Sequence, residues 1–232
     1  MNLHPYCTVF HTSLINNWAI LIANPVGQKM VGKLKSPPKK SPIAELMEHR
    51  RKELPGFDLE SICYTLFGVQ GLIGSEDIPS FIAGGVGVDL LGTKYLPDFS
   101  PRLHKDVDLY LPVQKRGPLI QILRGYGAEI GVSETSTLYL LRTNIKKLPF
   151  DFFSTGLSDN GILVPIPGKD EDDLRFVEIA AKPDWVVMGS FSFCVLDAAS
   201  QLKIQETVTE QNPRDMEILR RICGGMKTAP KK

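Results

Sequence analysis

Residues 81–111 read FIAGGVGVDLLGTKYLPDFSPRLHKDVDLYL, and their pattern indicates a strand, a tight turn, a helix and a second strand. The first strand is a short apolar run that ends in a glycine pair, and a helix-like segment follows the glycines. A polar connection then leads to residues 106–111, where acidic and apolar residues alternate with the period of a strand. Asp106 and Asp108 are two positions apart, so they share one face of that strand.

The glycine pair and the two aspartates point to complementary chemistry. Gly84 and Gly85 stand where a strand turns into a helix, so a phosphate group can approach the backbone and meet the N–H groups of the helix N-terminus. Two carboxylates held side by side on a strand repel each other unless a cation lies between them. Phosphate binding and metal binding at one place indicate a site for a nucleotide.

Size and composition are those of an ordinary globular protein with one main core. The chain has 232 residues, of which 43% are hydrophobic and 23% charged, and its formal net charge of +1 gives no global basis for nucleic-acid binding. The apolar run at 14–26 is interrupted by asparagines and is too short to span a membrane. The cysteines are widely spaced and form no CxxC motif, so we expect buried thiols in a reducing, cytoplasmic compartment.

Hydrophobic periods and turn residues predict an α+β fold, with a mixed twisted sheet, flanking helices and a small C-terminal helical part. Strands are expected at 78–83, 107–111, 147–153 and 174–179, with a hairpin at 128–132 and 137–142 and a short element at 184–187. Helices are expected from Ser41-Pro42 to Pro55, after an Asp58 cap as far as Gly71 or Gly74, and at 86–92, 118–126, 191–204 and 213–223. The polar residues 158–173 are interpreted as a loop.

This organisation divides the chain into four parts. They are a poorly defined N-terminal segment with a basic linker at 1–40, a core at 41–188, a C-terminal helical part at 189–224 and a disordered tail at 225–232. Lysines are concentrated at 29–40, and although they could contact nucleic acid, such loop lysines are more often simply solvated.

A third carboxylate is expected near the aspartate pair. Asp151 lies between Phe150 and Phe152 in an expected strand, so its side chain faces away from theirs. If Asp106 and Asp108 face a cleft, a neighbouring strand can bring Asp151 into the same cleft.

Together these features resemble the nucleotidyltransferases of the polymerase-beta type, which have GG before a short helix, DxD on a strand and an acidic residue on a later strand. Residues 84–92, GGVGVDLLG, and 102–109, RLHKDVDL, look like the GGWxxD…RxHxDxD signature of aminoglycoside and lincosamide nucleotidyltransferases. They also resemble the nucleotidyltransferase toxins of abortive-infection systems, which carry a later helical lysine followed by an acidic residue. Lys203 and Asp215, the latter beside Arg214, match that pair in type and order.

The resemblance implies a Mg²⁺-dependent transfer of NMP, AMP above all, from an NTP to a hydroxyl acceptor. It implies a catalytic and metal-binding triad for two Mg²⁺ ions, formed by Asp106, Asp108 and Asp151. The nucleotide phosphates would be bound by Gly84, Gly85 and Lys203. The acceptor would be a small molecule, a tRNA end or a protein side chain, and a toxin controlled by an antitoxin protein is one form of this activity. The oligomeric state is left open.

Further residues are candidates for contacting the metal ligands rather than the metal, namely Arg102, His104 and Asp215. His104 could orient the site or could be an ordinary loop histidine. Lys203 could reach the triphosphate or could form an exposed ion pair. Asp89, one turn into the expected helix, is expected to have a structural role.

One position departs from the family pattern. Val86 follows the glycines, where many relatives have Ser or Thr and the antibiotic-modifying members often have Trp. Nucleotide affinity could therefore be lower, or the acceptor different, although the carboxylates are intact. The alternative hypothesis is a non-catalytic nucleotide-sensing or interaction protein on the same fold. The near-neutral charge disfavours a third hypothesis, a nucleic-acid binder that acts through residues 29–40.

Overall fold

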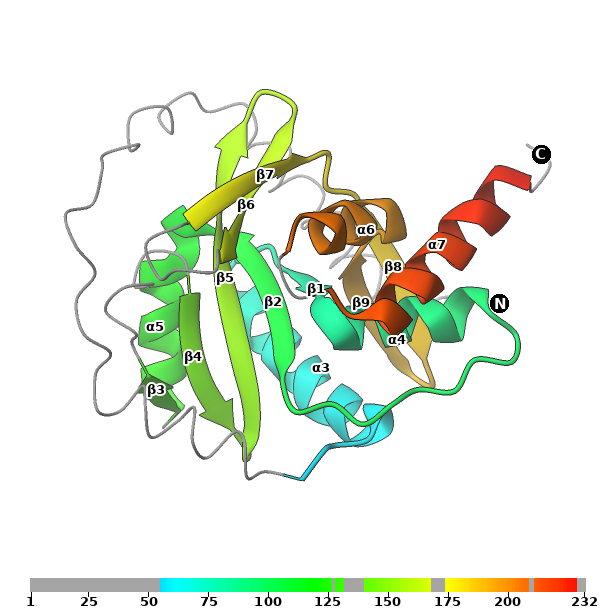
Figure 1. Cartoon of the computed structure of the whole chain (residues 1–232). Helices are drawn as coiled ribbons and strands as arrows, with labels where there is room; N and C mark the ends of the chain where they lie inside the picture. Colours follow the sequence, from blue (N-terminus) through cyan, green and yellow to red (C-terminus); the bar gives the residue numbers. More distant parts are fainter. Residues whose placement is uncertain (1–54, 127, 132–139, 168–173, 209–210, 229–232) are drawn as a thin grey trace.

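A mixed β-sheet with helices packed against it forms the centre of the described structure (Figure 1). The computed structural model describes residues 55–126, 128–131, 140–167, 174–208 and 211–228. The predicted α+β class and mixed sheet are confirmed. The expected helix that begins at Ser41-Pro42 and the basic segment at 29–40 lie outside the described residues, as does most of the expected hairpin's connection.

The described strands, in chain order, are β1 (Phe81–Ala83), β2 (Val107–Pro112), β3 (Glu129–Gly131), β4 (Leu140–Ile145), β5 (Leu148–Ser158), β6 (Gly161–Pro167), β7 (Leu174–Ile179), β8 (Pro183–Met188) and β9 (Phe191–Leu196). The described helices are α3 (Leu59–Ser75), α4 (Gly84–Tyr95), the short 3₁₀ helix η2 (Val113–Lys115), α5 (Arg116–Gly125), α6 (Ala198–Thr207) and α7 (Pro213–Thr228).

The sheet places β2 at its centre. The strand order is β3-β4-β5-β2-β1-β9-β8, and β6 and β7 continue from the end of β5. β2 runs antiparallel to β1 and parallel to β5, and β1 pairs in parallel with β9. Because β1, β2 and β5 are adjacent, residues from three separate stretches of sequence share one region of the sheet.

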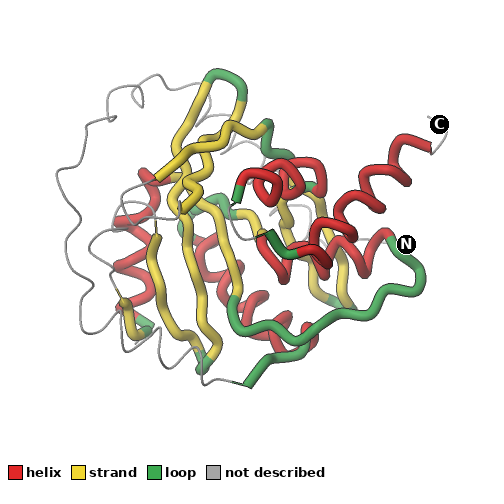
Figure 2. The backbone as a smooth tube through the Cα atoms, in the orientation of Figure 1, coloured by secondary structure: helices red, strands yellow, loops and turns green. Residues whose placement is uncertain are grey.

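Alternation along β2 separates an apolar face from a polar one. Val107, Leu109 and Leu111 are almost fully buried and belong to the core that α3 and α5 cover. Asp108 and Tyr110 point to the opposite face, where Tyr110 packs with apolar residues of β6, β7 and α6. Figure 2 shows the two sets of elements on either side of the strands. The carboxylates therefore lie on the face that the α6 and β6–β7 elements partly cover.

Local signals account for most of the element boundaries. The predicted Asp58 cap is confirmed, since its Oδ1 accepts a 2.7 Å hydrogen bond from the Ser61 N–H at the start of α3. Asp197 caps α6 in the same way, accepting a 3.1 Å bond from the Ser200 N–H. None of the helices in the described part of the chain has the length and apolar character that crossing a bilayer would need.

Three expectations for secondary structure were wrong. Residues 158–173 are not a continuous loop, because Gly161–Pro167 is the strand β6, in which Ile162, Val164 and Ile166 are buried despite the intervening prolines. Residues 191–204 are not one helix, because Phe191–Leu196 is the buried strand β9 and the helix begins only after Asp197. The tail was expected to be disordered from residue 225, but α7 continues to Thr228.

Leu109 follows Asp108 in β2 and faces the core on the opposite side of the sheet. Its side chain is 0% exposed, so Leu109→Ala leaves a cavity in the core. We expect the free energy of unfolding to fall by about 2–5 kcal/mol in urea denaturation. Leu103→Ala is the matched control, because Leu103 is 63% exposed and should change stability by no more than about 0.5 kcal/mol. Equal losses in the two variants would contradict this packing.

Candidate functional site

Three charged residues form a row across adjacent strands. Asp108 on β2 is the register partner of Asp151 on β5, and Asp151 is the partner of Arg142 on β4. Register partners project from the same face of a sheet, so the three side chains are neighbours. Asp106 lies just before the first residue of β2, two residues before Asp108. The structure thus brings Asp108 and Asp151 together, and the place of Asp106 beside them stays a prediction.

Gly84 brings the N-terminus of α4 against the Asp108 carboxylate. It follows Ala83, the β1 partner of Asp108, and adopts a φ of +59°. A Cβ atom at Gly84 would lie 1.9 Å from Asp108 Oδ2, so no larger residue fits without displacing that carboxylate. The N–H groups at the start of α4 and a carboxylate are therefore in direct proximity, as a phosphate and metal site requires.

The absence of a side chain at Gly85 makes room for the side chain of Arg102. A Cβ atom there would lie 2.4 Å from Arg102 Nη2 and 3.2 Å from His104 Nδ1. The first turn of α4 is therefore flanked by the Asp108 carboxylate at one glycine and by the Arg102 guanidinium at the next. Arg102 gives this turn a positive neighbour that an anionic ligand would meet.

A cavity of about 170 Å³ opens beside Gly84 and Asp108. Apart from these two residues and the glutamines Gln201 and Gln205 of α6, its walls are largely apolar or aromatic, formed by Ala83, Tyr110, Phe153, Pro165, Ile166, Ile204 and Val208. Pockets that bury a drug-sized ligand usually measure about 300–1,000 Å³, so this cavity takes only part of a nucleotide. Asp108 is the member of the carboxylate row that lines it.

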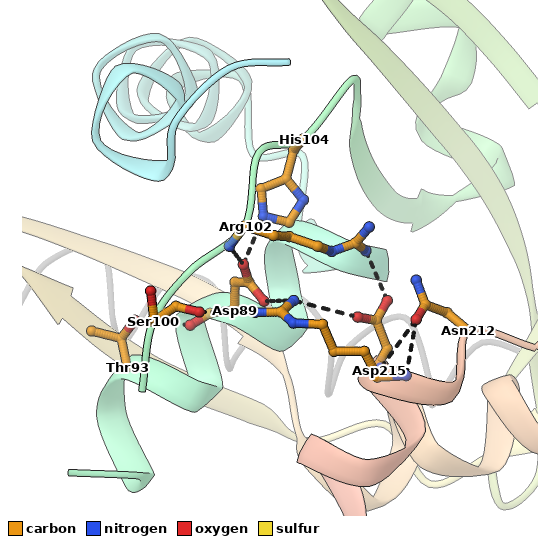
Figure 3. Close-up of polar contacts among 8 residues, drawn as sticks. Asp89, Thr93, Ser100, Arg102, His104, Asn212 and Asp215 are labelled. Carbon is orange, nitrogen blue, oxygen red and sulfur yellow. Dashed lines mark hydrogen bonds and ion pairs between the residues drawn. The ribbon is translucent and has the colours of Figure 1, made fainter. Parts of the chain in front are cut away.

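Asp89 is the centre of a buried polar network (Figure 3). Its side chain is fully buried, and Oδ2 accepts hydrogen bonds from the Arg102 backbone N–H at 2.7 Å and pairs with His104 Nε2 at 2.9 Å. Oδ1 accepts a 2.9 Å bond from Arg214 Nη1. Burial alone would raise the pKa of Asp89, but these donors and the charge of His104 outweigh burial and lower the pKa.

Asp215 ties the C-terminal helix into the same network. Its Oδ2 accepts a 2.9 Å hydrogen bond from Arg102 Nη2, and the side chain of Asn212 caps this end of α7 by accepting from the Asp215 N–H at 3.3 Å. Burial raises the pKa of Asp215, although Arg102 and Arg214 oppose the rise. Arg214 also donates to the Ser100 carbonyl at 2.9 Å.

The network fixes the segment that leads into β2. Arg102 and His104 belong to the connection between α4 and β2, and they are bonded to Asp89 of α4 and to Asp215 of α7. Asp106 follows His104 by two residues, so the anchoring acts immediately before the paired aspartates. The structure joins Arg102, His104 and Asp215 in one network with Asp89, whose bonds fit the structural role expected of it. The predicted contact of Arg102, His104 and Asp215 with the metal ligands stays a prediction. Their contribution to activity remains a prediction.

Lys203 lies on another side of α6 from the cavity. The residues of α6 that line the cavity are Gln201, Ile204 and Gln205, whereas Lys203 Nζ donates a 2.6 Å hydrogen bond to the Glu178 carbonyl of β7. Its proposed role as a phosphate ligand stays a prediction, and it would require this bond to be exchanged. Val86 is buried in the core and does not line the cavity, so it offers no side chain to a phosphate.

Arg142 was missed by sequence reasoning. Its Nε lies 3.4 Å from Asp151 Oδ2, which makes it the charged neighbour of the third predicted carboxylate. The signal was present in the strand pattern, because Leu141 and Thr143 are buried on one face and Arg142 must face the other. Without the register between β4 and β5, however, nothing indicated that this other face carries Asp151.

The donor set suits Mg²⁺ that is shared with a substrate. Among the described residues, no group of three or more His, Cys, Asp or Glu side chains is arranged to hold a metal ion by itself. Mg²⁺ is commonly bound by one or two carboxylates together with substrate phosphates rather than by an all-protein cage. Asp108 beside the Gly84 turn, with Asp106 two residues before it, fits that mode of binding.

Comparison with solved structures identifies the fold. The chain is similar to the lincosamide antibiotic adenylyltransferase LnuA with lincomycin bound, with 19% identity over 68% of this chain and 96% of that one and a TM-score of 0.50. It is also similar to ANT(2'')-Ia in solution, with 15% identity over 73% of this chain and 86% of that one and a TM-score of 0.48. For ANT(2'')-Ia in complex with adenylyl-2''-tobramycin, the identity is 15% over 72% and 90%, with a TM-score of 0.46.

The likeness to LnuA shows that this chain has the nucleotidyltransferase fold, in agreement with the predicted resemblance. No known protein-family profile matches the chain. No curated protein sequence matches it either.

Gly84→Ala should disrupt the site, because the added methyl group would displace the Asp108 carboxylate. Gly189→Ala is the matched control, since Gly189 has a φ of +60° and no heavy atom of another described part of the chain lies within 4 Å of its Cβ position. Both variants pay a backbone cost of about 1 kcal/mol, visible in urea denaturation. Only Gly84→Ala should also weaken nucleotide binding, measured by isothermal titration calorimetry with Mg²⁺ and an NTP. Equal nucleotide affinities in the two variants would refute the contact.

Asp89→Asn should lower the free energy of unfolding at neutral pH by about 3–5 kcal/mol, because Arg214 and His104 lose a buried anionic partner. Since the folded-state pKa of Asp89 lies below 3.8, its stabilising contribution is present above that pH and is lost as the pH falls through the folded-state pKa. The difference between wild type and Asp89→Asn in urea unfolding should therefore shrink as the pH is lowered below 3.8. The exposed Asp98→Asn variant is the control, and a difference that does not depend on pH would contradict the assignment.

Proposed function

We propose that this chain is a nucleotidyltransferase that moves NMP, AMP above all, from an NTP to a hydroxyl acceptor. The observation that carries the proposal is the contact between Gly84 and Asp108, which sets a helix N-terminus against a carboxylate in the same row as Asp151. A helix N-terminus binds phosphate, and a carboxylate beside it can bind the cation that accompanies phosphate. The nucleotidyltransferase fold supports the same conclusion.

We assign the parts of the nucleotide to different groups. The backbone N–H groups of Gly84 and Gly85 bind the phosphates, and Arg102, which flanks Gly85, adds positive charge on that side. The apolar cavity beside Asp108 takes the base, with Tyr110 and Phe153 in its wall. A base suits these walls because aromatic and aliphatic side chains cover its faces, while Gln205 offers an amide at the edge.

The transfer itself forms one bond and breaks another. The acceptor oxygen attacks the α-phosphorus, the bond from that phosphorus to the bridging oxygen breaks, and pyrophosphate leaves with the bonding electrons. Asp106, Asp108 and Asp151 would hold the metal, and Asp151 also accepts the proton of the acceptor hydroxyl. Mg²⁺, bound there as one or two ions, would supply charge stabilisation for the attacking and leaving oxygens.

The donor and acceptor are suggested by the fold relative. LnuA is named an adenylyltransferase of lincosamide antibiotics, which supports ATP as the donor and a small molecule as the acceptor for this chain. A tRNA end or a protein acceptor, and a toxin held in check by an antitoxin, rest only on the order of Lys203 and Asp215 in the sequence. Cys63 and Cys194 are buried thiols, which fits the proposed cytoplasmic location.

A non-catalytic nucleotide sensor is the second candidate. It is favoured by the ion pair between Arg142 and Asp151, which engages the third carboxylate with a cation other than a metal. On this alternative the fold binds a nucleotide at Gly84 and performs no transfer.

A nucleotidyl-transfer assay tests the two candidates. It contains the purified protein, Mg²⁺ and one NTP at a time, labelled at the α-phosphate. The acceptors offered are a panel of hydroxyl-bearing small molecules, tRNA and cell extract. Label should move from ATP to an acceptor with release of pyrophosphate. Asp106→Asn and Asp108→Asn should each reduce the rate by about a thousandfold, because several kcal/mol of transition-state stabilisation is lost.

Asp159→Asn is the matched control, because Asp159 is exposed in the β5–β6 turn and should leave the rate unchanged. The enzyme hypothesis would be rejected in favour of the sensor if the protein binds nucleotide, transfers label to no acceptor, and keeps the same nucleotide affinity in Asp108→Asn.

A further inference from the structure

Arg142 stands at one end of the carboxylate row. In register order the row runs from Arg142 on β4 through Asp151 on β5 to Asp108 on β2. Gly84 and the proposed base cavity lie at the Asp108 end, so Arg142 is at the end opposite the nucleotide. The side chain of Arg142 is 30% exposed and that of Asp151 is 5% exposed, so the guanidinium lies at the border between the buried carboxylate and solvent.

The ion pair between Arg142 and Asp151 is looser than the ion pairs of the Asp89 network. Arg142 Nε is 3.4 Å from Asp151 Oδ2, and this buried N–H has no hydrogen-bond partner among the residues that the structure describes. The pairs between Arg102 and Asp215 and between Arg214 and Asp89 are both 2.9 Å long and hydrogen-bonded. Charge-assisted bonds usually measure about 2.7–2.9 Å, so Arg142 attracts Asp151 without closing a bond to it. A pair of this kind can be exchanged for another cation more easily than the closed pairs can.

The charges of the row show what the exchange would do. Arg142 adds a positive charge beside Asp151, which is the register neighbour of Asp108. A guanidinium at that position repels a divalent cation that approaches the same carboxylate. Without Arg142, Asp108 and Asp151 would therefore attract divalent cations more strongly even when no nucleotide is present.

We propose that Arg142 is a positioning residue that competes with divalent cations for Asp151. It holds the Asp151 carboxylate at the acceptor side and weakens metal binding until a nucleotide arrives, and this inference rests on the proposed function of the same site. Two consequences have opposite signs. Loss of the guanidinium strengthens metal binding by the protein alone, and it slows transfer because Asp151 is no longer oriented toward the acceptor.

The test compares Arg142→Gln and Arg142→Lys with wild type and with Arg220→Gln. Arg220 is the matched control because its side chain is 61% exposed on α7, where it pairs only loosely with Glu206 at 3.7 Å. Mn²⁺ replaces Mg²⁺, and its binding without nucleotide is followed by the loss of the free-ion electron paramagnetic resonance signal. Transfer is measured in parallel as kcat and as KM for the NTP.

We expect Arg142→Gln to bind Mn²⁺ about tenfold more tightly than wild type. Its kcat should fall at least about tenfold, as is typical when a residue that orients a metal ligand is lost, while KM for the NTP stays unchanged. Arg142→Lys keeps the charge and should restore the wild-type Mn²⁺ affinity and part of kcat. Arg220→Gln should match wild type in every measurement.

Two results would overturn the proposed role of Arg142 and leave the proposed function standing. One is an unchanged Mn²⁺ affinity in Arg142→Gln, and the other is a parallel loss of metal affinity, kcat and stability in urea, which is what a merely structural residue produces. The proposed function fails separately. If wild type binds no Mn²⁺ with or without an NTP, or if Asp108→Asn binds Mn²⁺ as wild type does, the carboxylate row is not a metal site.

Discussion

The structure depends on the contact between the backbone of Gly84 and the carboxylate of Asp108. A side chain at Gly84 would overlap that carboxylate, so the two groups can be adjacent only because the turn between β1 and α4 has no Cβ atom. The antiparallel pairing of β1 with β2 sets the distance, since Ala83 and Asp108 are register partners. The result is that helix N–H groups and a carboxylate, which attract opposite charges, share one small space.

That arrangement requires the approach to β2 to be held firmly, and the Asp89 network provides this. Asp89 is fully buried and receives bonds from the connection before β2 and from α7, two segments distant from each other in the sequence. A buried carboxylate is costly without partners, so the network is stable only when all of its donors are present. The C-terminal helix thereby contributes to the placement of Asp106 and Asp108 without contacting them through this network.

The two faces of β2 have different surroundings in the sheet. Leu109 and its neighbours anchor the strand to the core, while Asp108 and Tyr110 face the cavity. The mixed pairing matters here, because β5 runs parallel to β2 and aligns Asp151 with Asp108. Strand β4 then aligns Arg142 with Asp151, so a cation supplied by the protein borders the carboxylates.

Sequence patterns predicted the elements that have strong local signals. The Asp58 cap, the helix after the glycines and the alternation around Asp108 could be recognised because caps, turns and strand periods depend on neighbouring residues. The errors at β6 and β9 have a common cause. The polar residues and prolines around β6 are typical of a loop, and the mainly apolar residues of β9 fit a helix as well as a strand. Burial between other elements makes both segments strands.

The sequence by itself determined which chemical groups the site could contain: a glycine turn, an aspartate pair on one strand face and a further aspartate between two phenylalanines. These follow from local geometry and from the chemistry of carboxylates and phosphates. Only the tertiary structure decided which groups are neighbours. Strand register placed Arg142 beside Asp151, and helix packing bonded Lys203 to the Glu178 carbonyl rather than placing it in the cavity. Register and packing join residues distant in the chain, and a local pattern carries no information about such pairings.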